Sequence, residues 1–256
     1  MFWLVRIPTG EDRYYKMKII TWNCNMAFRK KAHLILAHQP DIVVIQECEH
    51  PEKLIFNDGV PVPTSMLWFG KNKHKGLGIF SYSAFKLKLH RSYNDNLQLI
   101  VPVKISQGAA SFMLYAIWAN NPGDPDGQYV TQVWKAVHHY SKFISKKNTV
   151  LIGDFNSNTI WDRPRRAGNH STVVQHLAAK NIHSVYHKHF AQQQGKEAHP
   201  THFLYRHKHR PYHLDYCFAS IDFIDRLASV EVGDYDSWST YSDHVPIMIT
   251  FKDDIR

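Results

Sequence analysis

Five short polar motifs, each placed where an apolar run ends, constrain this chain more than any other feature. They are Trp22-Asn23, Gln46-Glu47, Gly153-Asp154-Phe155-Asn156, Leu214-Asp215-Tyr216 and Ser242-Asp243-His244. Each puts a carboxylate, an amide or an imidazole where a predicted strand leaves the core. Such groups, delivered to one place by separate strand ends, can form a metal-assisted hydrolytic site.

The apolar pattern predicts many strands and few helices. Residues 19–22, 27–39 and 42–45 read as a strand, a helix and a second strand, a βαβ-like opening. Further strands are expected at 66–69, 76–81, 97–105, 112–119, 149–152, 202–205, 214–219, 230–232 and 245–251, and helices at 129–145 and 171–180, the latter capped by Ser171. The pattern predicts an α/β fold with two packed, mixed β-sheets flanked by helices.

We expect an N-terminal appendage over residues 1–16 and one catalytic domain over 17–256. No apolar run approaches the roughly 20 residues of a membrane span. The N-terminus also lacks the pattern of a secretory signal. The three cysteines form no CxxC pair, which favours a reducing, cytoplasmic location.

The charge balance favours a polyanionic partner. The chain has 31 Lys and Arg against 22 Asp and Glu, a net charge of +9, and 18 His. A basic protein attracts nucleic acid, small phosphates or anionic membrane surfaces.

Each motif taken alone has an ordinary explanation. Glu47 could be an exposed residue starting a loop, although a carboxylate at the end of a buried strand favours a partner such as a divalent cation. Asp154 and Asn156 could close an Asx turn, or point to one side and hold water and phosphate. Asp243 and His244 are adjacent in an extended segment, so they would point apart and serve two roles.

In this order, the motifs resemble those of the endonuclease/exonuclease/phosphatase superfamily, and the resemblance runs from about residue 17 to 251. It implies a four-layer, largely antiparallel, deoxyribonuclease I-like α/β-sandwich that uses Mg²⁺ or Mn²⁺. Glu47 would be the main metal ligand. Asn23 would help position the metal or a phosphate, and Asp243 would be a ligand or lie beside the metal.

The same resemblance implies roles for the remaining polar residues. Asp154 would activate or orient the attacking water, and Asn156 would bind the phosphate. Asp215 would orient His244, which would stabilise the transition-state charge. Asn25 stands where some relatives have a metal-binding Asp, so we expect it to contact substrate instead.

The middle motif separates branches of the superfamily. Phosphodiesterase and phosphatase branches often carry a His at the end of the central strand, where this chain has Trp118-Ala119-Asn120. Asn120 is therefore a candidate phosphate contact, closer in kind to the exonuclease III-like branch. Trp118 could stack on a base or simply pack in the core.

A basic, His-rich stretch over 188–213 is expected to be a long, mostly exposed loop or hairpin. It offers Arg206 and Arg210 as substrate contacts at the rim of the site.

The sequence therefore predicts a divalent-metal-dependent phosphodiester hydrolase in which water attacks, and it favours a nuclease acting on DNA rather than RNA. One alternative is a phosphatase or phosphodiesterase for small-molecule or lipid phosphates. Another is a non-catalytic nucleic-acid-binding module. No obligate protein partner is evident.

Overall fold

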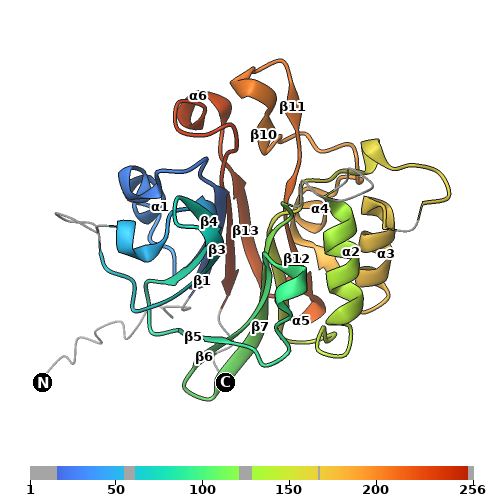
Figure 1. The fold of residues 1–256 in the computed structure, drawn as a ribbon. Coiled ribbons are helices and arrows are strands. Elements are labelled where there is room, and N and C mark those ends of the chain that lie inside the picture. Colours follow the sequence, from blue (N-terminus) through green and yellow to red (C-terminus); the bar gives the residue numbers. More distant parts are fainter. Residues whose placement is uncertain (1–15, 55–60, 121–128, 167, 253–256) are drawn as a thin grey trace, which may run out of the picture.

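The computed structural model describes residues 16–54, 61–120, 129–166 and 168–252. Two six-stranded sheets lie face to face, with helices on their outer faces (Figure 1). The first 15 residues of the predicted appendage lie outside the described residues, and Lys16 already belongs to the first strand.

The first sheet contains, in spatial order, β13 (Leu227–Val232), β14 (Ile247–Lys252), β1 (Lys16–Asn23), β2 (Ile42–Cys48), β4 (Lys75–Ser81) and β3 (Ser65–Asn72). The second contains β5 (Lys86–Leu89), β6 (Ile100–Gln107), β7 (Ala110–Trp118), β8 (Thr149–Asp154), β12 (Asp215–Ser220) and β9 (Ile182–Ser184). A small separate hairpin is formed by β10 (His202–Phe203) and β11 (Pro211–Tyr212).

Each large sheet has one parallel pair at its centre. β1 pairs with β2, and β7 pairs with β8; the other described strand pairs are antiparallel. Both sheets are therefore mixed and largely antiparallel, as predicted.

The α-helices are α1 (Ala32–Leu36), α2 (Val130–His139), α3 (His170–Ala178), α4 (Val185–Phe190), α5 (Ile221–Ile224) and α6 (Tyr235–Trp238). Short 3-10 helices are η1 (Phe28–Lys30), η2 (Pro51–Lys53), η3 (Asp95–Leu97), η4 (Thr159–Trp161) and η5 (Leu204–Arg206). None of the described helices is long and apolar enough to cross a membrane.

The core consists of three apolar layers, because strands at the centre of each sheet are buried on both faces. Ile19 and Val44 of the first sheet meet Leu114 and Val150 of the second between the sheets. The outer face of the second sheet packs on α2 and α3. The outer face of the first packs on η1, α1 and α6, which completes four layers.

Two local predictions about helices were wrong in part. The helix expected over 27–39 is only η1 and α1, because Ala27 adopts a left-handed backbone (φ 52°) and Lys31 (φ −124°) interrupts the turns. Ser171 does not cap α3. The carboxylate of Asp162 accepts the N–H groups of His170 and Ser171, at 2.8 and 2.9 Å.

The stretch 188–213 does contain a hairpin, but part of it is buried rather than exposed. Thr201, His202, Phe203 and His213 are buried. The reason is pairing with the chain before β14: the Phe203 N–H donates to the Asp243 carbonyl, and the Val245 N–H donates to the Thr201 carbonyl.

Candidate active site

The predicted polar motifs meet at one end of the two sheets. Asn23 ends β1 and Glu47 lies near the end of β2, the parallel pair of the first sheet. Asp154 ends β8 and lies opposite Trp118 at the end of β7, the parallel pair of the second. Because parallel strands end at the same edge, each central pair delivers its last residues to this place.

Asp154 is the centre of a polar cluster that joins the sheets. Its Oδ2 accepts hydrogen bonds from Asn23 Nδ2 at 3.1 Å and Asn156 Nδ2 at 3.2 Å, and its Oδ1 accepts the Asn156 N–H at 2.8 Å. The carboxylate has no exposed surface. Burial and the nearby Asp215 raise the pKa of Asp154, against His244 and the two amides, which favour its charged form.

Gly153 makes this geometry possible. Its φ of +143° is a conformation that L side chains rarely adopt, and an added Cβ would lie 1.9 Å from the Ile117 carbonyl oxygen of β7. The glycine therefore allows β8 to run close beside β7 while turning Asp154 into the cluster.

A second pair lies beside Asp154. His244 Nδ1 is 2.8 Å from Asp215 Oδ2, and both side chains are buried. Burial alone would lower the pKa of His244, but the charge and hydrogen bond of Asp215, with Asp154 and Asp243 nearby, raise it well above its usual value. This environment favours the charged form of His244, whose Nε2 takes no part in the contact with Asp215.

Backbone contacts hold this pair in place. The hydroxyl of Thr201 accepts the N–H groups of Leu214 and Asp215, at 2.9 and 3.0 Å. The indole N–H of Trp22 donates to the His244 carbonyl at 3.0 Å. Both supports come from segments distant in sequence, so the pair depends on the completed fold.

Asp243 makes contacts of its own, separate from the Asp215–His244 pair. Its Oδ1 accepts from Asn25 Nδ2 at 3.1 Å, and its Oδ2 lies 3.7 Å from His202 Nε2. Burial would raise the pKa of Asp243, but His202 and His244 hold it well below its usual value. The carboxylate is therefore charged and partly exposed, beside the ring of His202, whose centroid is 4.5 Å from that of His244.

Glu47 lies in the same region but is paired with a lysine. Lys75 Nζ is 3.0 Å from Glu47 Oε1 and 5.4 Å from the centroid of the Trp118 ring. Trp118 is only 3% exposed, so most of its surface packs in the core. A cationic group thus already balances the carboxylate predicted to hold a metal.

The donor atoms of the predicted metal ligands suit a hard divalent cation, although none of these residues belongs to the group of described acids and histidines whose ligand atoms converge. Glu47, Asp243 and Asn23 offer only oxygen donors of the kind that Mg²⁺ and Mn²⁺ prefer. In addition, Asp215 Oδ1 is buried and has no hydrogen-bond partner among the described residues. One group of described acids and histidines has ligand atoms all within 4.8 Å of one another, and it consists of Asp154, Asp215 and His244.

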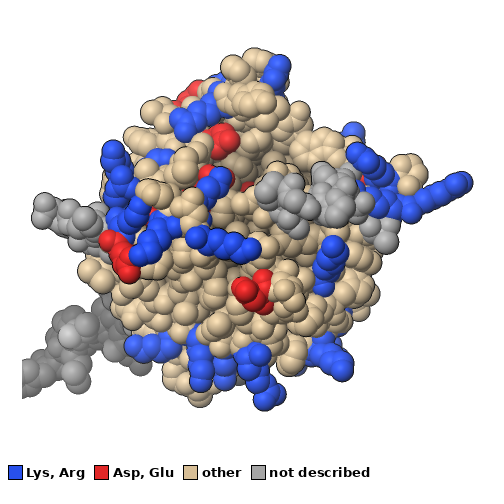
Figure 2. Space-filling model, in the orientation of Figure 1, with Lys and Arg blue, Asp and Glu red and all other residues tan. Residues whose placement is uncertain are grey.

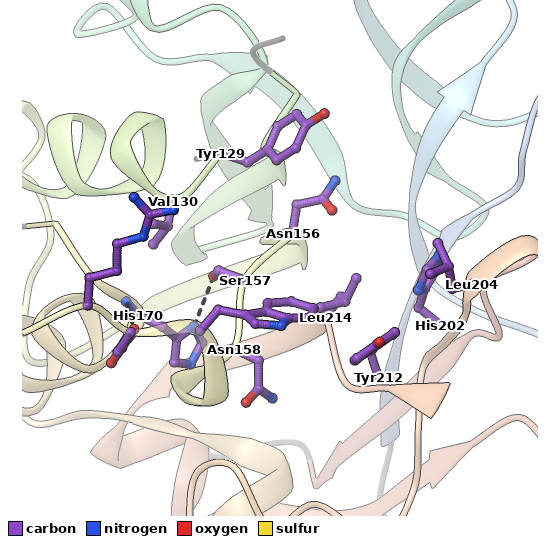
Figure 3. Close-up of a pocket in the computed structure, with 13 residues that line it drawn as sticks. Tyr129, Val130, Asn156, Ser157, Asn158, His170, His202, Leu204, Tyr212 and Leu214 are labelled. Carbon is purple, nitrogen blue, oxygen red and sulfur yellow. Dashed lines mark hydrogen bonds between the residues drawn. The ribbon is translucent and has the colours of Figure 1, made fainter. Parts of the chain in front are cut away.

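A cavity of about 530 Å³ opens beside Asn156. Figure 3 shows Tyr129 and Asn156 on one side of it and His202 and Tyr212 on the other. The Trp161 and Tyr212 rings line it with centroids 5.0 Å apart. Its size suits one small ligand or a single nucleotide unit.

The other predicted substrate contacts are more scattered. Asn120 lies half-buried just beyond β7, and it lines a second cavity with Trp118 and Lys75. Arg206 and Arg210 lie on the exposed turn between β10 and β11, and Arg206 Nη1 donates to the Thr240 carbonyl. No hydrogen bond or ion pair described in the structure joins either arginine to the Asp154 cluster.

Sequence reasoning did not single out Lys75, Thr201 or His202 for this site. Lys75 is the first residue of the glycine-rich strand β4, and Thr201 and His202 open the hairpin before the Asp215 motif. Their roles depend on strand register, which local pattern does not report.

The sequence matches the Endonuclease/Exonuclease/phosphatase family model over residues 20–244. No curated protein sequence matches the chain significantly.

Solved structures share the fold. A 3'-5' exonuclease from Neisseria meningitidis has a TM-score of 0.66 at 19% identity, covering 92% of this chain and 100% of its own. An AP endonuclease from Archaeoglobus fulgidus has a TM-score of 0.67 at 17% identity, covering 92% and 99%. An AP endonuclease from Leishmania major has 0.67 at 13% identity, covering 98% and 93%. At these identities the similarity establishes the fold, and the predicted two-sheet architecture is confirmed.

Proposed function

Because the chain belongs to the Endonuclease/Exonuclease/phosphatase family, as its motifs predicted, and is a hydrolase of phosphoric ester bonds, we propose that it is a divalent-metal-dependent nuclease acting on DNA. We further propose that it is closest in kind to the exonuclease III-like branch, and that one catalytic domain spans residues 17–256.

One observation carries the proposal: Asp154, buried between the sheets, is held by Asn23 and Asn156 next to the Asp215–His244 pair. Two carboxylates and an imidazole are rarely buried side by side unless a reaction requires it, because burying charged groups costs free energy. Their arrangement provides a proton acceptor and a cationic hydrogen-bond donor within one cluster.

In the proposed reaction, Asp154 orients the attacking water and accepts its proton, a role that its raised pKa suits. Asn156 Nδ2, which donates to Asp154 and to the Ala119 carbonyl, would turn one of these N–H groups to a phosphate oxygen when substrate binds. The charged His244, oriented by Asp215 through Nδ1, directs Nε2 toward the negative charge that develops on the phosphate. Water is the nucleophile, so no covalent Ser or Cys is needed.

Glu47, Asn23 and Asp243 are the residues proposed to hold Mg²⁺ or Mn²⁺. The ion would neutralise negative charge on the phosphodiester, which otherwise resists attack. Asn25, hydrogen-bonded to Asp243, would fix the orientation of that carboxylate.

The surface supports a nucleic-acid substrate. The face drawn in Figure 2 carries more Lys and Arg side chains than Asp and Glu side chains. Asn120 beside the cluster, and Arg206 and Arg210 on the β10–β11 turn, are the proposed contacts to the strand. Trp118, also predicted to stack on a base, is 3% exposed and packs in the core instead. A solved structure of similar fold is a 3' phosphatase from Neisseria bound to a product DNA hairpin, which supports DNA rather than RNA as the proposed substrate.

A phosphatase is the second candidate. The cavity of about 530 Å³ beside Asn156 could hold a small phosphate ester or a terminal nucleotide.

A cytoplasmic location stays a prediction, in keeping with the three free, buried cysteines.

A gel assay tests the proposal. The full chain is incubated with plasmid and with end-labelled single-stranded, double-stranded and abasic DNA and RNA, in Mg²⁺ or Mn²⁺. We expect metal-dependent cleavage of DNA by the wild type and a loss of about 10²–10⁴-fold in Asp154→Asn. Glu47→Ala should need more metal, whereas Lys135→Gln, an exposed change on α2, should behave as wild type.

Turnover of small phosphate esters without cleavage of nucleic acid would make the chain a phosphatase instead. DNA binding without hydrolysis in any metal would indicate a non-catalytic binding module.

A further inference from the structure

A second cavity, of about 550 Å³, adjoins the candidate active site through Lys75, the partner of Glu47. It runs between β3 and β4 of the first sheet and the segment around η3 and the end of β7 of the second. The aromatic, cationic and amide side chains that line it include Trp68, Phe69, Tyr93, Lys71, Lys75 and Asn120. We call this cavity the β3–η3 groove.

The groove is continuous with the catalytic cluster. Lys75, which lines it, pairs with Glu47, and Trp118, which also lines it, lies opposite Asp154 in the β7–β8 register. A strand whose phosphate lies at Asp154 would therefore have its neighbouring nucleotides at the mouth of the groove.

The lining has the chemistry of an unpaired-strand binding site. The Trp68, Phe69 and Tyr93 side chains are half-buried, and the ring of Phe69 on β3 lies 5.3 Å from that of Tyr93 in the segment between β5 and η3. Aromatic faces stack on bases of any sequence, and adjacent cations track the phosphates. Lys71 and Lys75 supply those cations, against one carboxylate in the lining, Asp95.

The size of the groove favours a short unpaired segment over a duplex. A cavity of this volume holds ligands of drug-like size, which corresponds to one or two nucleotides. Paired bases present only their edges, so they could not reach half-buried rings inside a groove. Bases that stack here must be free of a partner strand.

Lys75 links this groove to metal binding. Its ammonium neutralises Glu47 at 3.0 Å, and a divalent ion at Glu47 would take over that task. The flexible side chain would then be released toward the groove, where a phosphate is the natural partner for its charge.

We propose that the β3–η3 groove binds one or two unpaired nucleotides next to the scissile phosphate, stacked on its aromatic rings, and that Lys75 moves from Glu47 to a phosphate when metal binds. The inference deepens the proposed nuclease function and rests on it. It makes a DNA end or junction with an unpaired tail a better ligand than a blunt duplex.

Fluorescence anisotropy with the full chain tests the groove. An Asp154→Asn background in Mg²⁺ prevents cleavage, and the probes are a labelled blunt DNA hairpin and the same hairpin with an unpaired tail at either end. We expect one tail to tighten binding about tenfold, the size expected for a stacked base. Tyr93→Leu and Lys71→Gln should each lose most of that gain, whereas Lys135→Gln should keep it.

Lys71 is exposed, so Lys71→Gln tests the groove even where Tyr93→Leu is unstable. Equal affinity for blunt and tailed hairpins, or equal effects of Lys71→Gln and Lys135→Gln, would overturn the groove assignment. Hydrolysis by the wild type is measured in parallel. If the wild type cleaves DNA but binds blunt and tailed hairpins equally, only the groove proposal fails. If the tail tightens binding but no DNA is cleaved, only the nuclease proposal fails.

The displacement of Lys75 has its own readout. Titration of Lys75→Gln with Mn²⁺, followed by the electron paramagnetic resonance of the free ion, should show severalfold tighter metal binding, because Glu47 loses a competing cation. The same variant should bind the tailed hairpin more weakly in Mg²⁺. Weaker Mn²⁺ binding would mean that Lys75 positions Glu47 for the metal, which would overturn this part of the proposal.

Discussion

The buried imidazole of His213 should make the protein sensitive to mild acid. Its Nδ1 donates to the His199 carbonyl at 2.7 Å, and its Nε2 is buried without a hydrogen-bond partner among the described residues. Protonation would place a charged N–H there with nothing to accept it. Burial therefore lowers the pKa of His213 to about 4, although the His199 carbonyl and Glu197 oppose the shift.

The sign follows from proton linkage. Between about pH 6.5 and 4 the unfolded chain binds a proton at His213 and the folded chain does not, so stability falls as the pH falls through this window. Each pH unit in it contributes about 1.4 kcal/mol. Because the loss begins near pH 6.5, His213 alone should lower the free energy of unfolding by about 2 kcal/mol between pH 7 and pH 5.

Other groups titrate in the same range, so the measurement compares variants. Urea unfolding followed by tryptophan fluorescence gives the free energy of unfolding at pH 7 and pH 5 for wild type, His213→Gln and His209→Gln. His213→Gln should lose about 2 kcal/mol less than wild type between the two pH values. His209, on the exposed β10–β11 turn, controls for removal of an imidazole, and its variant should lose as much as wild type.

An equal loss in wild type and His213→Gln would refute the reasoning, because it would mean that the folded protein accepts a proton at His213 as readily as the unfolded chain. A nuclear magnetic resonance titration of the ring gives an independent check. Its midpoint should lie near pH 4, well below the usual value of about 6.5.

Three further predictions concern the candidate active site and its support. Asp215→Asn should slow hydrolysis by about 10²–10⁴-fold. It should also shift the alkaline limb of the pH–rate profile to lower pH, because His244 loses the partner that raises its pKa. An unchanged alkaline limb would contradict the Asp215–His244 pairing. Gly153→Ala should lower the free energy of unfolding, measured from thermal melts, by at least about 3 kcal/mol, because the new Cβ would lie 1.9 Å from the Ile117 carbonyl oxygen. Gly108→Ala, in an open turn at φ +57°, should lower it by only about 1 kcal/mol. Chelation by EDTA should abolish hydrolysis, and added Mg²⁺ or Mn²⁺ should restore it. The Glu47→Gln variant should need at least about tenfold more metal for the same activity. Activity that survives the chelator would exclude a metal-dependent site.

The sequence predicted the strands best where burial leaves one choice. Residues 42–45 and 149–152 are continuous apolar runs, and both form central strands that are buried on two faces. Asp154 and Asn156 were expected either to point to one side or to close an Asx turn. The Asn156 N–H donates to Asp154 Oδ1 at 2.8 Å, and Asn156 has a left-handed backbone (φ 49°), which is the turn. Such inferences need only local geometry, which the sequence carries.

What the sequence could not predict depends on contacts between distant segments. The helix over 27–39 has the right apolar spacing, yet a left-handed residue at Ala27 shortens it. His202 lies beside His244 only because an isolated antiparallel bridge pairs the two residues. Lys75 reaches Glu47 because β2 and β4 are neighbours in a sheet whose strand order crosses over in sequence.

The parallel pairs explain why five weak motifs add up to one site. Each sheet is largely antiparallel, so most neighbouring strands end at opposite edges, but β1–β2 and β7–β8 end together. The Asn23–Asp154 hydrogen bond at 3.1 Å closes the gap between the two sheets at that edge. Packing the sheets and assembling the cluster are therefore one event, and a change that shifts one sheet against the other should weaken catalysis before it unfolds the protein.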